Sequence, residues 1–236
     1  MDCLMLRLDA PLMSFGGVLI DQINPIDRFP GKSLLTGLLG NALGWDHADH
    51  GRLADLQSRL QLAARWDAEP TRLIDYHTVD LGQAFLCDTG WTTRGQREDR
   101  KGASSTGTHQ RFRHYWANGC ATLAVGLASE GIPSLEQLEA ALRAPRRPLF
   151  IGRKTCVPSA PLWLGRRQAA SLRDALAAEP LAEIGARSRP ARIEACWPVE
   201  DGAAVEQRQV YDLRDWRNNL HAGSERYAVG LLEVQP

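Results

Sequence analysis

Hydrophobic and polar residues alternate with a period of two at the start of the chain. In Cys3–Asp9, Leu4, Leu6 and Leu8 take every second position, and Arg7 is among the residues between them. Such alternation is typical of a half-buried β-strand. The pattern therefore predicts a first strand over these residues.

The next apolar pattern has the period of a helix. In Ser33–Gly44 the leucines at positions 34, 35, 38, 39 and 43 fall on one helical face, and Ser33 stands where an N-cap is expected. We predict a helix here and a second, shorter one around Arg52–Arg59. The glycines at 37 and 40 allow another backbone to approach the first helix closely.

Strand and helix patterns return later in the chain. Leu60–Asp67 and Cys120–Leu127 have strand-like composition. Ser134 and Gln137 form a capping box for a helix over Leu135–Arg143. An extended segment begins at Leu149–Ile151.

Residues 68–118 are mostly polar and rich in Gly, Thr and Arg, which is too long a stretch for an ordinary connection. We interpret them as a functional excursion in the form of a projecting hairpin. The order is then β-α-β, a long arm and β-α-β, an α+β fold of the ferredoxin-like (RRM-like) β-α-β-β-α-β class. We assign this core to residues 1–165.

The remaining chain, 166–236, is expected to form a small C-terminal β subdomain. An Ala/Arg/Pro-rich stretch over 166–191 precedes three short strand patterns, Ile193–Val199, Gln207–Leu213 and Tyr227–Val234.

Composition and N-terminus narrow the class of protein. Of the 236 residues, 44% are hydrophobic and 24% charged, as in ordinary globular proteins. Polar residues interrupt the N-terminal apolar run, so we expect neither a signal peptide nor a membrane span. Five scattered cysteines without a C-x-x-C pair favour a reducing compartment and disfavour a zinc knuckle. A cytoplasmic protein that makes no contact with a membrane and has no cofactor or metal is expected.

Charge is distributed unevenly along a chain whose formal net charge is zero. Residues 94–114 hold 6 basic and 2 acidic side chains, and residues 143–167 hold 7 basic and none acidic. Arginine supplies 25 of the 28 cations, and its planar guanidinium engages phosphate bidentately and stacks on bases. The two basic segments are therefore the candidate sites for a polyanion.

The first basic segment mixes cations with flat side chains. If the arm is extended, one side of it carries Thr108, Gln110, Phe112 and His114, and the other carries His109, Arg111, Arg113 and Tyr115; Arg94, Arg97, Arg100 and Lys101 precede them. Single-stranded RNA is held by such mixtures, with cations on phosphates and rings under bases. A solvated charged hairpin is the alternative that composition leaves open.

The second basic segment places Arg153 and Lys154 directly after Gly152. A glycine there lets a phosphate approach backbone amides, although a structural turn with surface cations explains the same pattern. Phe29–Ser33 resembles part of a Walker loop, but Ile26 stands where that loop needs glycine, so ATP binding is rejected. Lys32 and Ser33, at a helix start, remain candidates for contact with a phosphate of another ligand.

Histidines offer two weaker candidate sites. Asp46-His47-Ala48-Asp49-His50 contains metal-ligand types, yet a solvated loop is favoured. Tyr76-His77 and His114-Tyr115 supply acid–base groups suited to metal-independent RNA cleavage. No Gly-x-Ser-x-Gly elbow occurs.

Five motifs occur in an order that resembles one known family. They are Asp27-Arg-Phe-Pro-Gly-Lys-Ser33, Gly37-Leu-Leu-Gly-Asn-Ala-Leu-Gly44, Asp75-Tyr-His-Thr78, Arg97-Glu-Asp-Arg-Lys-Gly102 and Phe150-Ile-Gly-Arg-Lys-Thr-Cys156. The chain resembles CasD-type subunits of the type I-E CRISPR Cascade complex, within the RAMP superfamily. The likeness runs from the first strand to about Gly165.

This resemblance implies a ferredoxin-like core with a protruding thumb at about 76–118 and a role in antiviral defence. It implies a non-catalytic subunit that holds the 5′ handle of the crRNA and caps the backbone filament next to the large subunit. The implied partners are the crRNA, a CasC-type backbone subunit through the thumb, a CasA-type large subunit and, indirectly, target DNA. The RNA-binding residues expected from motifs and composition together are Arg28, Lys32, Ser33, Tyr76, His77, Arg100, Lys101, His109, Gln110, Arg111, Phe112, Arg113, Arg153 and Lys154.

A catalytic alternative stays open. A sister branch, in type I-C systems, cuts CRISPR repeat RNA with a tyrosine, a lysine and a histidine. Tyr76, His77 and Lys101 supply these residue types here without a matching motif. The alternative function is therefore a metal-independent endoribonuclease that processes repeat RNA.

Overall fold

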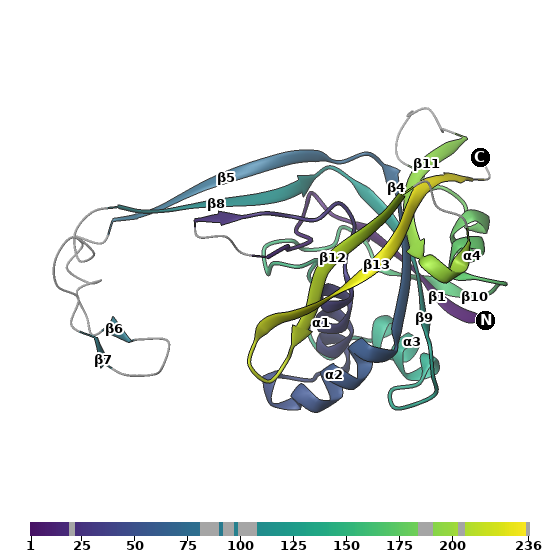
Figure 1. Ribbon diagram of the computed structural model, residues 1–236, viewed down its shortest axis with the longest axis horizontal. Helices are drawn as coiled ribbons and strands as arrows, with labels where there is room; N and C mark the ends of the chain where they lie inside the picture. The colour runs from purple at the N-terminus through teal and green to yellow at the C-terminus, as the bar shows by residue number, and fades with distance from the viewer. Residues whose placement is uncertain are drawn as a thin grey trace.

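The computed structural model describes residues 1–18, 22–80, 90–91, 97–98, 108–183, 191–202 and 206–234. Seven of its strands are β1 (Asp2–Asp9), β4 (Leu60–Ala68), β9 (Cys120–Leu127), β10 (Trp163–Gln168), β11 (Arg192–Pro198), β12 (Glu206–Asp215) and β13 (Leu220–Glu233). They form one sheet in the order β10-β1-β9-β4-β11-β13-β12, in which every neighbouring pair is antiparallel (Figure 1). The fold is mixed α+β.

Six elements follow the expected β-α-β-β-α-β order. They are β1, α1 (Lys32–Leu43), β4, β9, α3 (Leu135–Arg143) and β10, with η1 (His47–Asp49) and α2 (His50–Arg59) inserted after α1. The capping box of α3 is confirmed, because the Ser134 hydroxyl accepts from the backbone N–H of Gln137 and the Gln137 side chain accepts from that of Ser134. Local sequence thus sets where this helix begins.

The sheet buries a core on each of its faces. Leu4, Leu6 and Leu8 of β1 pack with α1 and α3 in one core, while Cys3 and Met5 face the other. The second core is covered by α4 (Leu172–Ala178), a helix that the sequence pattern did not predict. None of the helices in the described ranges is long and apolar enough to cross a membrane.

The C-terminal strands, which the sequence assigns to a small β subdomain, extend the main sheet. Ala195 and Cys196 of β11 pair with Arg65 and Ala64 of β4, so the sheet continues without a break into β13 and β12. Pairing with β4 satisfies backbone groups that a separate small sheet would leave on an exposed edge.

The last strand of the β-α-β-β-α-β series also lies later in the chain than expected. Residues 149–151 are not in a strand, and β10 begins at Trp163 instead. The chain turns at Gly152, whose φ of 89° interrupts the extended run, and the N–H of Ile151 donates to the carbonyl of Cys156. The expected boundary at residue 165 therefore falls within β10.

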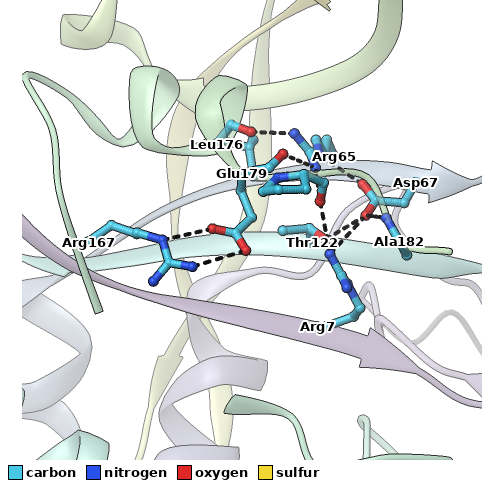
Figure 2. Close-up of polar contacts among 9 residues, drawn as sticks. Arg7, Arg65, Asp67, Thr122, Arg167, Leu176, Glu179 and Ala182 are labelled. Carbon is cyan, nitrogen blue, oxygen red and sulfur yellow. Dashed lines mark hydrogen bonds and ion pairs between the residues drawn. The ribbon is translucent and has the colours of Figure 1, made fainter. Parts of the chain in front are cut away.

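A buried ion pair fixes α4 against the sheet (Figure 2). Arg65 of β4 is fully buried, and its Nε donates to Asp67 Oδ1 at 2.8 Å. The rest of its guanidinium donates to the carbonyls of Leu176, Glu179 and Pro180, at and after the end of α4. A cation is favourable at the C-terminus of a helix, where carbonyls lack intrahelical partners.

The carboxylate of Asp67 completes this network. Its Oδ2 accepts from the hydroxyl of Thr122 and from the backbone N–H of Ala182, both at 2.8 Å, and lies 3.5 Å from Arg7 Nη2 (Figure 2). The guanidinium nitrogens of Arg65 and both carboxylate oxygens of Asp67 thus have partners, as buried polar groups usually do. The segment after α4 is held to β4 and β1 by polar contacts, in addition to apolar packing.

The N-terminus of α1 is capped by a carboxylate from β12. The expectation that Ser33 is the N-cap is therefore wrong. The N-cap is Gly31, and no side chain caps it locally. Asp212 of β12 accepts from the backbone N–H and the hydroxyl of Ser33, at 2.7 and 2.5 Å. A Cβ on Gly31 would overlap this carboxylate, which explains the glycine.

The long arm contains a hairpin that projects from the body of the protein (Figure 1). β5 (Thr71–Asp80) pairs antiparallel with β8 (Thr108–Ala117) over their full lengths. The short strands β2 (Leu12–Met13) and β3 (Ile23–Asn24) also pair with β8. Beyond the hairpin, β6 (Gly90–Trp91) pairs with β7 (Arg97–Glu98). We call β5 and β8 the thumb hairpin.

Candidate nucleic-acid interface

One face of the thumb hairpin is basic. Strand alternation places His109, Arg111, Arg113 and Tyr115 of β8 on the same side, and the register places Asp75 and His77 of β5 opposite Arg113 and Arg111. We call this side the Tyr115 face. His109 and Arg113 are exposed, and Arg111 is partly buried.

The opposite side, the Phe112 face, is aromatic and apolar near its middle. Tyr76 pairs with Phe112 across the strands, and their ring centroids lie 5.0 Å apart. Tyr76 is 51% exposed and Ile74 beside it 55%. Gln110 shares this face. The pair of rings thus lies on the side of the hairpin opposite Arg111 and Arg113.

The tyrosine–histidine pairs do not form acid–base pairs in this geometry. Tyr76 and His77 are consecutive in β5 and point to opposite faces, as do His114 and Tyr115 in β8. His114 and Tyr115 are also buried. Burial, the Arg72 guanidinium 2.6 Å from Nδ1 and the nearby Arg153 lower the pKa of His114. This ring is therefore held neutral inside the thumb base.

Arg153 connects the second basic segment to the Tyr115 face. Its guanidinium lies 4.5 Å from the centroid of the Tyr115 ring, and Nη1 donates to the carbonyl of His114 at 2.9 Å. Lys154 next to it is exposed. The two basic segments, about forty residues apart in the chain, thus meet at the base of the thumb.

Gly152 is needed for packing within the protein, next to the contact between Arg153 and Tyr115. Its φ is 89°, in the left-handed region that favours glycine, and a Cβ there would overlap the carbonyl oxygen of Ser14. Glycine is therefore needed at position 152 because the backbone of Ser14 approaches it closely. The turn at Gly152 places Arg153 next to Tyr115.

A groove of about 880 Å³ runs from this turn along α1, and we call it the α1 groove. Among the residues that the structure describes, four cations line it, Arg147, Arg153, Lys154 and Arg214, together with one carboxylate, Asp46. His47 and His221 line it as well. In a chain with no net charge, this concentration of cations makes the groove a local attractor for anions.

The α1 groove also has an apolar part. Gly37, Leu34 and Leu38 of α1 line it, together with Trp45 and the largely buried Trp216. Trp216 comes from the tip of the β12–β13 hairpin, and its Nε1 donates to Gln57 of α2 at 3.1 Å. Arg147 donates to the carbonyls of Gly44 and Trp45, which fixes it beside the C-terminus of α1.

Arg28, a predicted RNA contact, is engaged inside the protein. Its guanidinium lies 5.5 Å from the ring centroid of Trp66 and 5.6 Å from that of Trp116, and it forms ion pairs with Glu69 and Glu194. Only 19% of its side chain is exposed. Burial by itself lowers the pKa of Arg28, but the hydrogen bonds and charges of the two carboxylates raise it by more. The net effect is a raised pKa. The residue joins the thumb base to the main sheet.

Lys32 and Ser33 are engaged as well. Lys32 Nζ lies 2.6 Å from Glu225 Oε1, and Ser33 binds Asp212. Ser33 still lines the α1 groove, whereas Lys32 does not. The position that a phosphate was expected to take at this helix start is filled by the carboxylate of Asp212.

Two predicted contacts, Arg100 and Lys101, lie outside the described residues. The structure brings Arg153, Lys154 and Ser33 together at the α1 groove and His77, His109, Arg111 and Arg113 together on the Tyr115 face. It adds residues not predicted as contacts: Trp45, Arg147, Arg214, Trp216 and His221. Of these, only Arg147 carried a signal, as part of the basic segment 143–167.

The described residues contain no group of three His, Cys, Asp or Glu side chains that could hold a metal ion. Asp46 and Asp49, from the weak metal motif, form the capping box of η1 instead.

Burial raises the pKa of the Cys120 and Cys196 thiols to about 12, so both remain protonated at neutral pH.

Comparison with known proteins places the chain in a family. Residues 3–227 match the family described as CRISPR-associated protein (Cas_Cas5). The chain belongs to this Cas5 family. It is 34% identical over 181 residues to the CRISPR system Cascade subunit CasD of Escherichia coli (strain K12), which covers 73% of this chain and 75% of that protein.

Solved structures share the fold of this Cas5 chain. A chain of a "CRISPR RNA-guided surveillance complex" aligns with a TM-score of 0.70 and 24% identity, over 98% of this chain and 90% of that one. A "Crystal structure of Cas protein" aligns with a TM-score of 0.66 and 25% identity, over 98% and 95%. The shared fold therefore spans nearly the whole chain, including the C-terminal strands.

Proposed function

We propose that this Cas5 protein is a non-catalytic RNA-binding subunit of a Cascade-type CRISPR surveillance complex, in which it holds the 5′ handle of the crRNA. Its ferredoxin-like core carries a thumb, and the RNA lies on the Tyr115 face of that thumb and in the α1 groove. The likeness to the CasD subunit supports this assignment.

The observation that carries the proposal is the continuity of these two surfaces at Arg153. Arg153 lines the α1 groove and also stacks on Tyr115 at the base of the thumb. Asn24 lines the groove too and pairs with Arg113 in the thumb sheet. A single strand has flexible phosphates and exposed bases, so it can follow a basic track that turns from a hairpin into a groove.

The assembly partners are proposed on the basis of the same family relationship. We propose that the thumb contacts a CasC-type backbone subunit, that a CasA-type large subunit lies beside the RNA-bound face, and that target DNA is engaged only through the complex. The exposed apolar side chains of the Phe112 face, Ile74 and Tyr76, are suited to contact with another protein. Assembly on crRNA places the protein in the cytoplasm.

RNA retention by the purified complex tests the RNA-binding role. The paired substitution Arg113→Ala and Lys154→Ala removes one exposed cation from the Tyr115 face and one from the groove. Arg192→Ala with Arg208→Ala, on β11 and β12, is the charge-matched control. We expect the first pair to release crRNA and the control to retain it; equal retention would contradict the proposal.

One observation favours a second function, a metal-independent endoribonuclease. His77 Nε2 lies 2.5 Å from Asp75 Oδ2 on the Tyr115 face, a pair suited to a general base. Incubation of the full chain with labelled repeat RNA in EDTA decides between the two. Intact RNA supports the non-catalytic role, and cleavage that disappears in His77→Ala supports the ribonuclease.

A further inference from the structure

We propose that the α1 groove takes one unstacked base of the bound single-stranded RNA, with the base against Gly37, Trp45 and Trp216 and the flanking phosphates near Arg147 and Lys154. This inference rests on the proposed RNA-binding function and names the part of the RNA that its groove recognises.

The size of the groove limits what can enter it. About 880 Å³ lies within the range of roughly 300–1,000 Å³ that holds small-molecule ligands. Such a volume accepts a nucleotide or two, while the rest of the strand stays on the open basic surface. A double helix does not enter a site of this size.

The two parts of the groove match the two parts of a nucleotide. Its four cations suit phosphates, and its indoles and leucines suit the flat, weakly polar faces of a base. Arg214 lines the groove with its guanidinium 5.3 Å from the Trp216 ring.

Gly37 shows that space is kept open at this point. A Cβ there would meet only Cη2 of Trp216, at 3.7 Å, which is ordinary contact. Alanine is the better helix former, so packing within the protein does not require glycine at position 37. Gly40, one turn later, differs. A Cβ added there would lie 2.7 Å from Leu53 Cδ2, so the close approach of α2 accounts for glycine at position 40.

The test substitutes Gly37 and compares it with a second helical glycine. Gly37→Ala and Gly37→Leu add side-chain volume to the groove, whereas Gly51→Ala lies in α2 with no atom within 4 Å of its Cβ. Each full-length variant is titrated with fluorescein-labelled single-stranded RNA that carries the 5′-handle sequence of the host's CRISPR repeat. A series of probes carries an abasic nucleotide at each position in turn.

We expect one abasic position to lower the affinity of the unsubstituted protein by roughly tenfold, as for loss of one stacked base. In Gly37→Leu the intact RNA should bind as weakly as that abasic probe, and the abasic substitution should then have little further effect. Gly37→Ala should weaken binding less, without lowering the melting temperature, and Gly51→Ala should leave binding unchanged.

Two results would separate the inference from the function on which it rests. If every abasic position has the same small effect and Gly37→Leu binds normally, no base enters the groove, while loss of binding in Arg113→Ala with Lys154→Ala would still support RNA binding. If that cation pair is also without effect, the RNA-binding proposal fails as well.

Discussion

The guanidinium of Arg153 lies 4.5 Å from the centre of the Tyr115 ring and donates to the carbonyl of the neighbouring residue, His114, at 2.9 Å. Arg153 belongs to the turn between α3 and β10, and Tyr115 to β8, the return strand of the thumb. Their contact is the point at which the thumb hairpin and the α1 groove become one surface, and it fixes the direction in which Arg153 is presented.

Substitution of Arg153 by lysine separates charge from position. Lysine keeps the charge but lacks the planar guanidinium that stacks on the ring and reaches the carbonyl. We expect Arg153→Lys to lower RNA affinity several-fold although the net charge is unchanged, because the flexible ammonium is not held in one position by a flat contact with the ring and a bond to the carbonyl. Affinity measured for Arg153→Lys and Arg153→Met at one salt concentration checks this; equal affinity of Arg153→Lys and the unsubstituted protein would show that only charge matters.

The salt dependence of binding reports how many phosphates are contacted. For a single strand, log affinity falls by about 0.7 per contacted phosphate for each log unit of salt. If Arg113 and Lys154 each contact one phosphate, their joint replacement by alanine should reduce this slope by about 1.4. Titrations at several salt concentrations measure the slope, and Arg192→Ala with Arg208→Ala should leave it unchanged.

Removal of the Asp212 carboxylate should weaken the attachment of the β12–β13 hairpin to α1. In Asp212→Ala the backbone N–H of Ser33 loses its acceptor, which costs roughly 1–3 kcal/mol of unfolding free energy when the donor is left buried. Asp212→Asn retains an acceptor and should lose less. Urea unfolding of the two variants checks the order; equal losses would mean that the hydrogen bond contributes little.

Asp212 should also give the protein a characteristic pH dependence. Burial raises the pKa of this carboxyl in the folded protein, although hydrogen bonds from Ser33 partly oppose the effect. The folded state then binds a proton more tightly than the unfolded state, so this group favours folding less as pH rises from about 3.9 through the folded pKa. Relative to Asp212→Asn, the stability of the unsubstituted protein should therefore fall with rising pH in that window, and a flat difference would contradict the assignment.

Loss of Arg65 should be the most damaging of these changes to stability. Arg65→Ala leaves the buried Asp67 carboxylate without its closest cation and removes the donors to three carbonyls at the end of α4. Breaking a buried ion pair in this way costs about 3–5 kcal/mol. The control is Arg192→Ala, whose partner Glu233 is exposed, and it should change stability by less than about 1 kcal/mol in the same urea titration.

Local sequence predicted most of the secondary structure because periodicity and capping act over a few residues. The period-two leucines of β1 and the capping box of α3 are examples, and both lie where they were expected. Helix α4 was missed because its seven residues lie in a stretch whose Ala, Arg and Pro content hides the apolar positions. Its stability comes from Arg65 and from the second core, which are distant in sequence.

Sequence alone established that two arginine-rich segments interrupt a neutral chain, that a long polar arm separates two β-α-β units, and that the motifs resemble one family. These are properties of neighbouring residues, so the order of residues suffices to reveal them. Tertiary structure alone decided which cations face outward. Arg28 and Lys32 bind carboxylates from the loop after β4, from β11 and from β13, because a cation in a folded protein pairs with whichever carboxylate the chain places beside it. Ser33 binds a carboxylate from β12. Arg153 instead stacks on the thumb, and Trp45, Arg147, Arg214 and Trp216 meet across a groove that no stretch of sequence contains.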